Sequence, residues 1–247
     1  MVEKVKTGIK GLDKILRGGL PKQSIVLLSG TPGTGKSILC SQVLYNAALE
    51  GKKCLYLNLE QNSHRLEEQM RGFGWDAKKV EKNLKIVAVD SSDPELVEFV
   101  LREVQKTKYD LIVLDSLDSI SSTPMETEEL GKMSMQKISE SVLPTVVDMP
   151  TVGRMKLKKI FTAIANSKAT ALLTSEKVEN ALGFSRDTIS EFLCDAIIVL
   201  TYSSVAGGAN RTLEIRKNRL SKFDEGIMPM EISDKGIVVT PLEEEKL

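Results

Sequence analysis

Residues 30–37 read Gly30-Thr31-Pro32-Gly33-Thr34-Gly35-Lys36-Ser37 and fit the pattern G-x-x-x-x-G-K-[ST] in full. They follow the apolar run 25–29 and open a segment with helical spacing, which is the strand–loop–helix context that the pattern requires. Glycines permit positive φ, so successive backbone N–H groups can converge on phosphate oxygens. The helix N-terminus adds a partial positive charge, Lys36 adds a full one, and Ser37 offers a hydroxyl to Mg²⁺. We therefore expect this whole loop to bind a nucleotide. No G-x-G-x-x-G is present, which argues against a dinucleotide-binding Rossmann site.

Short apolar runs rich in β-branched residues alternate with longer amphipathic stretches in the first two thirds of the chain. The runs are 25–29, 53–59, 84–89, 111–114 and 169–174, and the stretches with helical spacing include 37–49, 64–73 and 94–106. This alternation predicts an α/β fold, a P-loop NTPase core with a mostly parallel twisted sheet flanked by helices. The later runs 196–202, 212–216, 227–232 and 237–240 leave no room for helices between them. They predict a C-terminal antiparallel β extension at the edge of the sheet.

Length and composition are those of an ordinary globular protein. The 247 residues are 41% hydrophobic and 28% charged, with zero formal net charge, and we expect a single domain over 1–247. This composition excludes a disordered chain and a disulfide scaffold, and a nucleic-acid site would have to be local. The three cysteines are widely spaced in apolar runs and favour core positions rather than a metal site. With no apolar segment of about 18–20 residues and no secretory signal, we expect a cytoplasmic protein that does not enter the membrane.

The segment 121–159 separates two predicted core strands by more than one helix needs. We interpret it as a helical insertion over about 124–152, followed by a core helix over 154–167. It contains five of the nine methionines and the cations Arg154, Lys156, Lys158 and Lys159, and Arg186 follows in a later loop. Three readings stay open: contact with single-stranded DNA through the cations, a methionine-rich surface for a protein partner, or packing within the chain's own fold.

An apolar run that ends in a carboxylate, Leu111-Ile112-Val113-Leu114-Asp115, is typical of a Walker B strand. A carboxylate at the end of a buried strand is costly unless it serves a cation, so we expect Asp115 to hold Mg²⁺ with Ser37, directly or through a water. Asp110 and Asp118 are the alternative ligands.

Hydrolysis needs a group that activates water at a strand end near the γ-phosphate, and Glu60 follows the run after the P-loop helix. A solvated acid opening the next helix is the alternative for Glu60. The transition state also needs a cation, often from a neighbouring subunit, and Lys217 and Arg219 are spaced to point the same way from one strand. A solvated edge strand is the alternative for this pair.

These residues together resemble the single-domain KaiC-like ATPases of the RecA superfamily, a group that includes archaeal RadA paralogues. The resemblance is carried by Thr7-Gly8-Ile9-Lys10-Gly11-Leu12-Asp13, by Gly18-Gly19-Leu20-Pro21, and by the order of the motifs above. It implies ATP hydrolysis by a homo-oligomer, a hexameric ring or a filament, with nucleotide between subunits. By position, Glu60 would polarise the attacking water, while Lys217 and Arg219 would reach the γ-phosphate of the adjacent subunit.

Two departures accompany the resemblance. The second of two adjacent acids common in the family is Gln61 here, and Ser175-Glu176 stand where RecA places a glutamine sensor. The leading hypothesis is an Mg-dependent oligomeric ATPase in a regulatory or DNA recombination and repair role. The alternatives are a recombinase paralogue that binds DNA, and a nucleotide-gated scaffold with little turnover that presents its insertion to a protein partner.

Overall fold

The computed structural model describes residues 2–60, 63–122, 149–178, 182–205 and 208–242. Most strands join one nine-stranded sheet in the order β11-β10-β9-β8-β3-β7-β6-β4-β5. The strands are β3 (Ile25–Gly30), β4 (Cys54–Asn58), β5 (Leu84–Ala88), β6 (Leu111–Asp115), β7 (Thr170–Glu176), β8 (Ala196–Val205), β9 (Gly208–Asn218), β10 (Ile227–Ser233) and β11 (Gly236–Val239). The predicted α/β class and mostly parallel sheet are confirmed.

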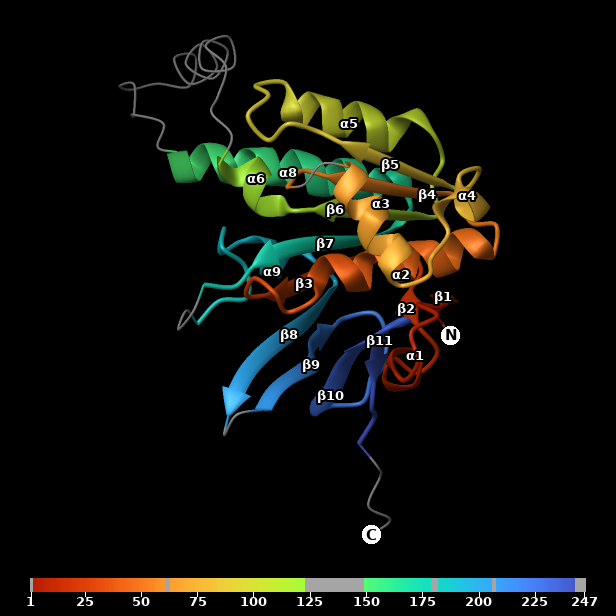
Figure 1. Ribbon diagram of the computed structural model, residues 1–247. Coiled ribbons are helices and arrows are strands. Elements are labelled where there is room, and N and C mark those ends of the chain that lie inside the picture. The colour runs from red at the N-terminus through yellow and green to blue at the C-terminus, as the bar shows by residue number, and fades with distance from the viewer. Residues whose placement is uncertain (1, 61–62, 123–148, 179–181, 206–207, 243–247) are drawn as a thin grey trace, which may run out of the picture.

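The sheet changes direction at β8. Strands β8, β3, β7, β6, β4 and β5 run parallel to one another, whereas β9, β10 and β11 alternate in antiparallel hairpins. The sequence pattern placed the run 196–202 in the antiparallel extension. In the structure β8 also pairs in parallel with the P-loop strand β3, because a crossover through the 182–189 loop and a short helix precedes it. Figure 1 shows β9–β11 and the far end of β8 extending away from the other parallel strands.

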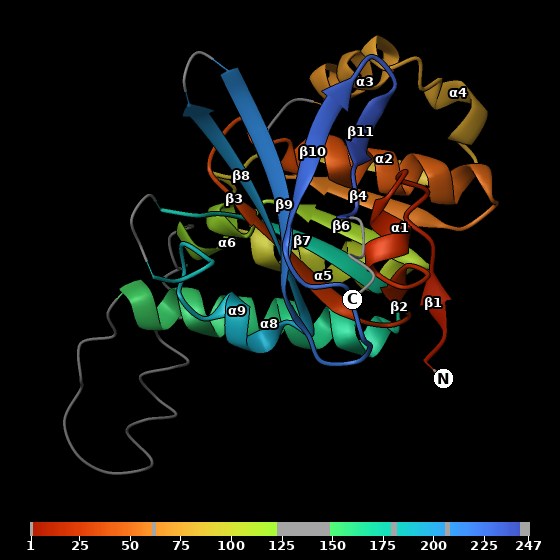
Figure 2. The ribbon, with the colours of Figure 1, turned by 90° about the horizontal axis from the view of Figure 1, so that it is seen from below.

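Helices cover both faces of the parallel strands (Figures 1 and 2). On one face lie α1 (Leu12–Ile15), α2 (Lys36–Leu49), α3 (Ser63–Gly72) and α4 (Ala77–Val80), and on the other α5 (Leu96–Lys106), α6 (Leu117–Ser122), α8 (Met149–Ser167) and α9 (Ser190–Leu193). Each face buries its own apolar cluster, and β3 and β6 are buried along their whole length. Continuous burial explains why these strands have apolar runs without alternation.

The N-terminal segment that contains the 7–13 motif forms an arm that packs against the C-terminal hairpin. The Asp13 carboxylate accepts hydrogen bonds from the backbone N–H groups of Thr7 and Gly8, at 2.8 and 3.0 Å, and from the Thr7 hydroxyl at 2.8 Å. A Cβ at Gly11 would lie 1.7 Å from the carbonyl oxygen of Val239, so only glycine fits against β11. The arm, which also includes β1 (Lys4–Val5) and β2 (Leu20–Pro21), therefore ties the N-terminus to the C-terminal hairpin.

The predicted insertion over about 124–152 lies almost entirely outside the described residues, as does Gln61. The following helix is longer than expected, since α8 begins at Met149 rather than at residue 154. All three cysteines are buried and unpaired, as their apolar contexts indicated. In the part of the chain that the structure describes, no helix is long and apolar enough to cross a membrane.

Candidate nucleotide-binding site

The P-loop joins β3 to α2 in the geometry that an anion site needs. Gly33 and Gly35 have φ of 79° and 106°, values that glycine adopts without strain. Gly35 is the N-cap of α2, and glycine has no side chain that could accept a hydrogen bond there. The backbone N–H groups of the first helical turn are therefore not used by a capping side chain. A Cβ at Gly33 would have nothing within 4 Å, so the loop tip is open on the side where that Cβ would point. A phosphate chain fits these donors and the helix dipole.

The Lys36 side chain folds back over the P-loop, where we expect it to bind phosphate. Its Nζ donates hydrogen bonds to the carbonyl oxygens of Gly30 at 2.8 Å and Thr31 at 3.2 Å. The hydroxyl of Thr34 also donates to the Thr31 carbonyl, at 2.8 Å, and holds the loop closed on itself. The ammonium group is therefore already at the phosphate-binding loop.

Asp115 is buried at the end of β6 and is held by two hydroxyl groups. The Tyr56 hydroxyl donates to its Oδ2 at 2.7 Å, and the Thr174 hydroxyl donates to its Oδ1. Burial and then the negative charge of Asp115 raise the pKa of Tyr56 well above its usual range, so Tyr56 keeps its proton and remains a donor. Burial and then the charge of Asp115 also raise the pKa of Cys40, which lies one turn along α2 from Lys36. Asp115 is thus within electrostatic range of the first turns of α2.

The oxygen donors present suit Mg²⁺. The Ser37 hydroxyl and the Asp115 carboxylate are hard ligands, and Mg²⁺ usually binds through one or two protein oxygens together with phosphates and waters. Among the described residues no group of three or more His, Cys, Asp and Glu side chains could hold a metal ion alone. A magnesium ion at this edge would accordingly depend on nucleotide phosphates for the rest of its coordination.

Strand register brings the remaining acidic residues to the same edge. In the pairing of parallel strands Gly30 is opposite Glu176, and Asn58 is opposite Asp115. Glu60 follows β4 by two residues, is exposed, and has its backbone N–H bonded to the side chain of Asn58 at 3.2 Å. Carboxyl ends of parallel strands are where α/β folds place ligands.

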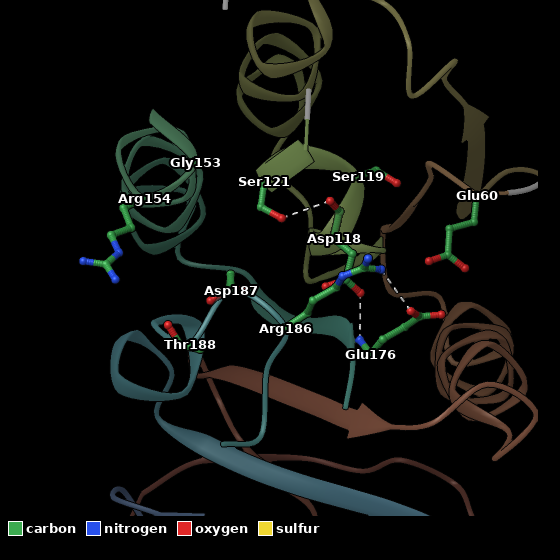
Figure 3. A pocket seen from close by; sticks show the side chains of 10 residues that line it. All are labelled: Glu60, Asp118, Ser119, Ser121, Gly153, Arg154, Glu176, Arg186, Asp187 and Thr188. Carbon is green, nitrogen blue, oxygen red and sulfur yellow. Dashed lines mark hydrogen bonds and ion pairs between the residues drawn. The ribbon is translucent and has the colours of Figure 1, made fainter. Parts of the chain in front are cut away.

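A cavity of about 620 Å³ opens beside this edge (Figure 3). It is lined by Glu60, Asp118, Ser119, Ser121, Gly153, Arg154, Glu176, Arg186, Asp187 and Thr188. Asp118 accepts hydrogen bonds from the Glu176 N–H at 2.7 Å and the Ser175 hydroxyl at 3.0 Å. Burial raises the pKa of Asp118 to about 6, against the opposing effect of these two donors. Through these two hydrogen bonds Asp118 links α6 to β7. This is a structural role rather than metal binding.

Lys217 and Arg219 lie at the amino ends of the parallel strands, whereas the P-loop lies at their carboxyl ends. Because β9 is antiparallel to β8, Lys217 pairs with Ile197 at the start of β8, and the Arg219 N–H bonds to Asp195, which in turn bonds to Ile25. The five residue-to-residue steps from Ile25 to Gly30 span about 16 Å along the strand, more than the length of an arginine side chain. Neither cation therefore reaches the P-loop of the same chain.

The two cations differ in their local surroundings. Strand β9 ends at Asn218, so exposed Arg219 lies one residue beyond it, in a cavity with Arg17 and Lys222. The Lys217 ammonium donates to the carbonyl oxygens of Glu191 and Cys194, at 2.7 and 2.6 Å. The end of α9 therefore fixes Lys217, whereas Arg219 is exposed.

Sequence reasoning missed Arg211. Its Nη2 lies 3.4 Å from the carbonyl oxygen of Gly33, and its Cζ lies 4.8 Å from the centre of the Tyr202 ring. Its buried Nε has no hydrogen-bond partner among the described residues. Only the pairing of Tyr202 with Arg211 in a long β8–β9 hairpin brings this cation over the tip of the P-loop. The sequence did offer one signal: residues two apart on a strand share a face, so Arg211 lies on the same face as the apolar Leu213 and Ile215.

The cations considered for DNA do not form one free surface. Lys156 is buried, Lys159 lies 3.8 Å from Glu98, and Arg186 is paired with Glu176 at 3.3 Å. Arg154 lines the cavity beside Glu60, whereas Lys158 lines a different, apolar groove between α5 and α8. These positions do not give the continuous cationic track that a nucleic-acid backbone would follow.

Comparisons with known proteins identify the family and the fold. A sequence model of the KaiC ATPase family matches residues 5–244. A UPF0273 protein of Thermotoga maritima is 30% identical over 243 residues, 98% of each chain. A UPF0273 protein of Aeropyrum pernix is 33% identical over 242 residues, 98% of this chain and 95% of its own. The crystal structure of the KaiC-like protein PH0186 from Pyrococcus horikoshii OT3 matches with a TM-score of 0.79 at 30% identity, covering 98% of this chain and 100% of that one.

Proposed function

The chain belongs to the KaiC family of ATPases, and on that premise we propose that it binds and hydrolyses Mg-ATP at interfaces between identical subunits. One observation carries the proposal: the P-loop, Asp115 and Glu60 gather at one edge of the sheet, while Lys217 and Arg219 lie at the other. Each subunit thus carries two halves of a site that cannot meet within it. A ring or filament of identical subunits brings such halves together.

In the proposed complex the P-loop N–H groups and Lys36 bind the phosphates. Ser37 and Asp115 hold Mg²⁺, which neutralises charge on the phosphate oxygens when bound. Tyr56 and Thr174 orient the Asp115 carboxylate through the two hydrogen bonds described above. Arg211 adds positive charge at the loop tip from the same subunit.

Glu60 is the proposed group that orients and deprotonates water. Its exposed carboxylate lies in the cavity beside the P-loop edge, where an attacking water has access. General-base residues of this kind contribute about 10²–10⁴-fold to rate. Arg219 of the adjacent subunit, with Lys217 as its fixed neighbour, supplies the cation for the transition state.

Replacement Glu60→Gln tests this role. We expect ATP binding to be unchanged, because the P-loop is intact, and steady phosphate release to fall by at least about 100-fold. The control is Glu68→Gln, an exposed acid on α3 that should leave turnover unchanged. Unchanged turnover in Glu60→Gln would remove Glu60 from the mechanism.

A titration of protein concentration tests the interface. Specific phosphate release should rise with concentration as subunits associate, alone and with single-stranded DNA. Full activity in a dilute, demonstrably monomeric sample would contradict a site shared between subunits. A further rise with DNA would favour the DNA-related role, and tight ATP binding without turnover would favour the scaffold, whose insertion lies outside the described residues.

A further inference from the structure

The 182–189 loop contacts both halves of the proposed site, and one of its contacts is with the P-loop edge. Arg186 pairs with Glu176, with Nη1 3.3 Å from Oε2, and its N–H donates to the Ser175 hydroxyl at 3.2 Å. Glu176 is opposite Gly30 in the β3–β7 ladder, and the next N–H, that of Lys177, bonds to the Gly30 carbonyl at 3.2 Å. Figure 3 shows the Arg186 guanidinium in the cavity between Asp118 and Glu176. A cation on this loop thus sits one strand away from the start of the P-loop.

The same loop is hydrogen-bonded to α9, the helix whose end fixes Lys217. The backbone N–H groups of Phe184 and Ser185 donate to the carboxylate of Glu191 on α9, the latter at 3.2 Å. The Glu191 carbonyl oxygen accepts from Lys217, as described above. The Phe184 ring lies between two cations, 5.7 Å from Lys177 Nζ and 5.3 Å from Arg216 Cζ. Continuous contacts therefore lead from Glu176 to Lys217.

We propose that Arg186 senses the γ-phosphate of its own subunit's nucleotide, and that its loop passes this information to the Lys217–Arg219 pair presented to the next subunit. The inference rests on the proposed function, because it assumes ATP in the P-loop and a shared interface. It adds a residue that touches the nucleotide and a direction of coupling between neighbouring sites.

Charge explains why ATP and ADP would differ at this point. The γ-phosphate brings additional negative charge to the end of the P-loop, which repels the Glu176 carboxylate and attracts the Arg186 guanidinium. The side chains of Arg186 and Glu176 are 61% and 35% exposed, so their ion pair is weak and can be exchanged for a phosphate contact. ADP lacks that phosphate and leaves the pair intact. A ligand shifts a conformational equilibrium only through such a difference in interaction.

The first test compares affinities for the non-hydrolysable analogue AMP-PNP and for ADP, with Mg²⁺, by calorimetry. Arg186→Gln should lower the ratio of AMP-PNP affinity to ADP affinity by about tenfold, the effect of losing one charge-assisted hydrogen bond. Glu176→Gln should leave the ratio equal or raise it, since it frees Arg186. Arg154→Gln is the matched control, an exposed arginine in the same cavity that should leave the ratio unchanged. An unchanged ratio in Arg186→Gln overturns the proposal, as does an equal loss in Glu176→Gln, which would indicate a purely structural ion pair.

The second test follows the coupling by hydrogen exchange with mass spectrometry. AMP-PNP, but not ADP, should change exchange in peptides covering residues 182–193 and 213–220, and Arg186→Gln should abolish the difference while Arg154→Gln keeps it. Equal exchange with both nucleotides in the wild-type protein, or a difference that survives in Arg186→Gln, overturns the coupling. Failure of the proposed function looks different: neither nucleotide would protect residues 30–37, or specific phosphate release would not rise with protein concentration.

Discussion

The carboxylates at the P-loop edge differ in their surroundings, and these surroundings assign them different roles. Asp115 is buried and accepts hydrogen bonds from two hydroxyl donors, which orient its carboxylate at the position proposed for Mg²⁺. Asp118, three residues on, has a pKa raised by burial, and its carboxylate accepts hydrogen bonds from backbone and hydroxyl groups of β7. Glu60 is open to water, as a group that activates water must be. Three acids within one small region thus have three different environments.

Asp118 should make stability depend on pH between about pH 4 and pH 6. Burial raises its pKa from 3.8 to about 6, so the folded state binds its proton more tightly than the unfolded state in this window. The free energy of unfolding therefore falls as pH rises through the window, by up to about 3 kcal/mol from this group. We expect Asp118→Asn to remove this decline, as measured by urea unfolding at a series of pH values. Parallel profiles for the two proteins would contradict the assignment.

At the residue scale, sequence alone indicated the groups that belong to contiguous motifs. The 30–37 loop, Asp115 and Glu60 are adjacent to strands whose ends could be read from apolar runs, so their shared edge followed from a parallel sheet. Arg211 and Arg186 could not be assigned in that way. Alternation along 211–215 indicates which face of its strand Arg211 occupies, but its place over the P-loop depends on the register of a hairpin. The position of Arg186 depends on the path of an irregular loop, which has no periodic signal in the sequence.

At the scale of elements, the sequence predicted the helices and strands well and their connections less well. Apolar period and length indicate a buried strand, but they do not specify which neighbour it pairs with, so β8 was assigned only to the antiparallel extension. The turn at Asp234 and Lys235 was visible because a glycine follows it. Gly236 has φ of 114° and packs against Trp75 and Gln42.

Replacing Gly236 tests how firmly the β10–β11 hairpin is held over α2. A Cβ there would lie 2.6 Å from the Trp75 ring and 2.7 Å from Gln42 Oε1, in addition to the unfavourable φ. We expect Gly236→Ala to lower the free energy of unfolding by about 2–4 kcal/mol. The emission of Trp75, the one tryptophan of the chain, should change as well.

Gly51→Ala is the matched control for the conformational part of that effect. Gly51 also has positive φ, 83°, but a Cβ there meets nothing within 4 Å. It should cost only about 1–2 kcal/mol and leave the Trp75 emission unchanged. Equal losses in the two variants would show that contact with Trp75 and Gln42 contributes nothing.

At the scale of the whole molecule, the antiparallel direction of β9 gives each subunit two unlike sides. One side presents the P-loop and the other presents Arg219, so an assembly that uses both must be head-to-tail. An isologous dimer would join like sides and complete no site. The direction of a single strand thus determines which symmetries the proposed enzyme can use.

Mixing two inactive proteins tests this arrangement. Arg219→Ala subunits retain an intact P-loop and Glu60, and Glu60→Gln subunits retain an intact Arg219. Each should be nearly inactive alone, yet an equal mixture should recover activity at about one quarter of its interfaces, where an intact half meets an intact half. A mixture as inactive as its components would contradict a shared site, and so would full activity of Arg219→Ala alone.

Such complementation requires that the subunits all face the same way along the assembly. A chain of subunits that all face the same way carries a vacant nucleotide half-site at one tip and an unused arginine at the other. Closing into a ring removes both, so every P-loop gains a donor and the number of complete sites equals the number of subunits. An open filament always has one complete site fewer than it has subunits, and growth at its two ends is chemically distinct.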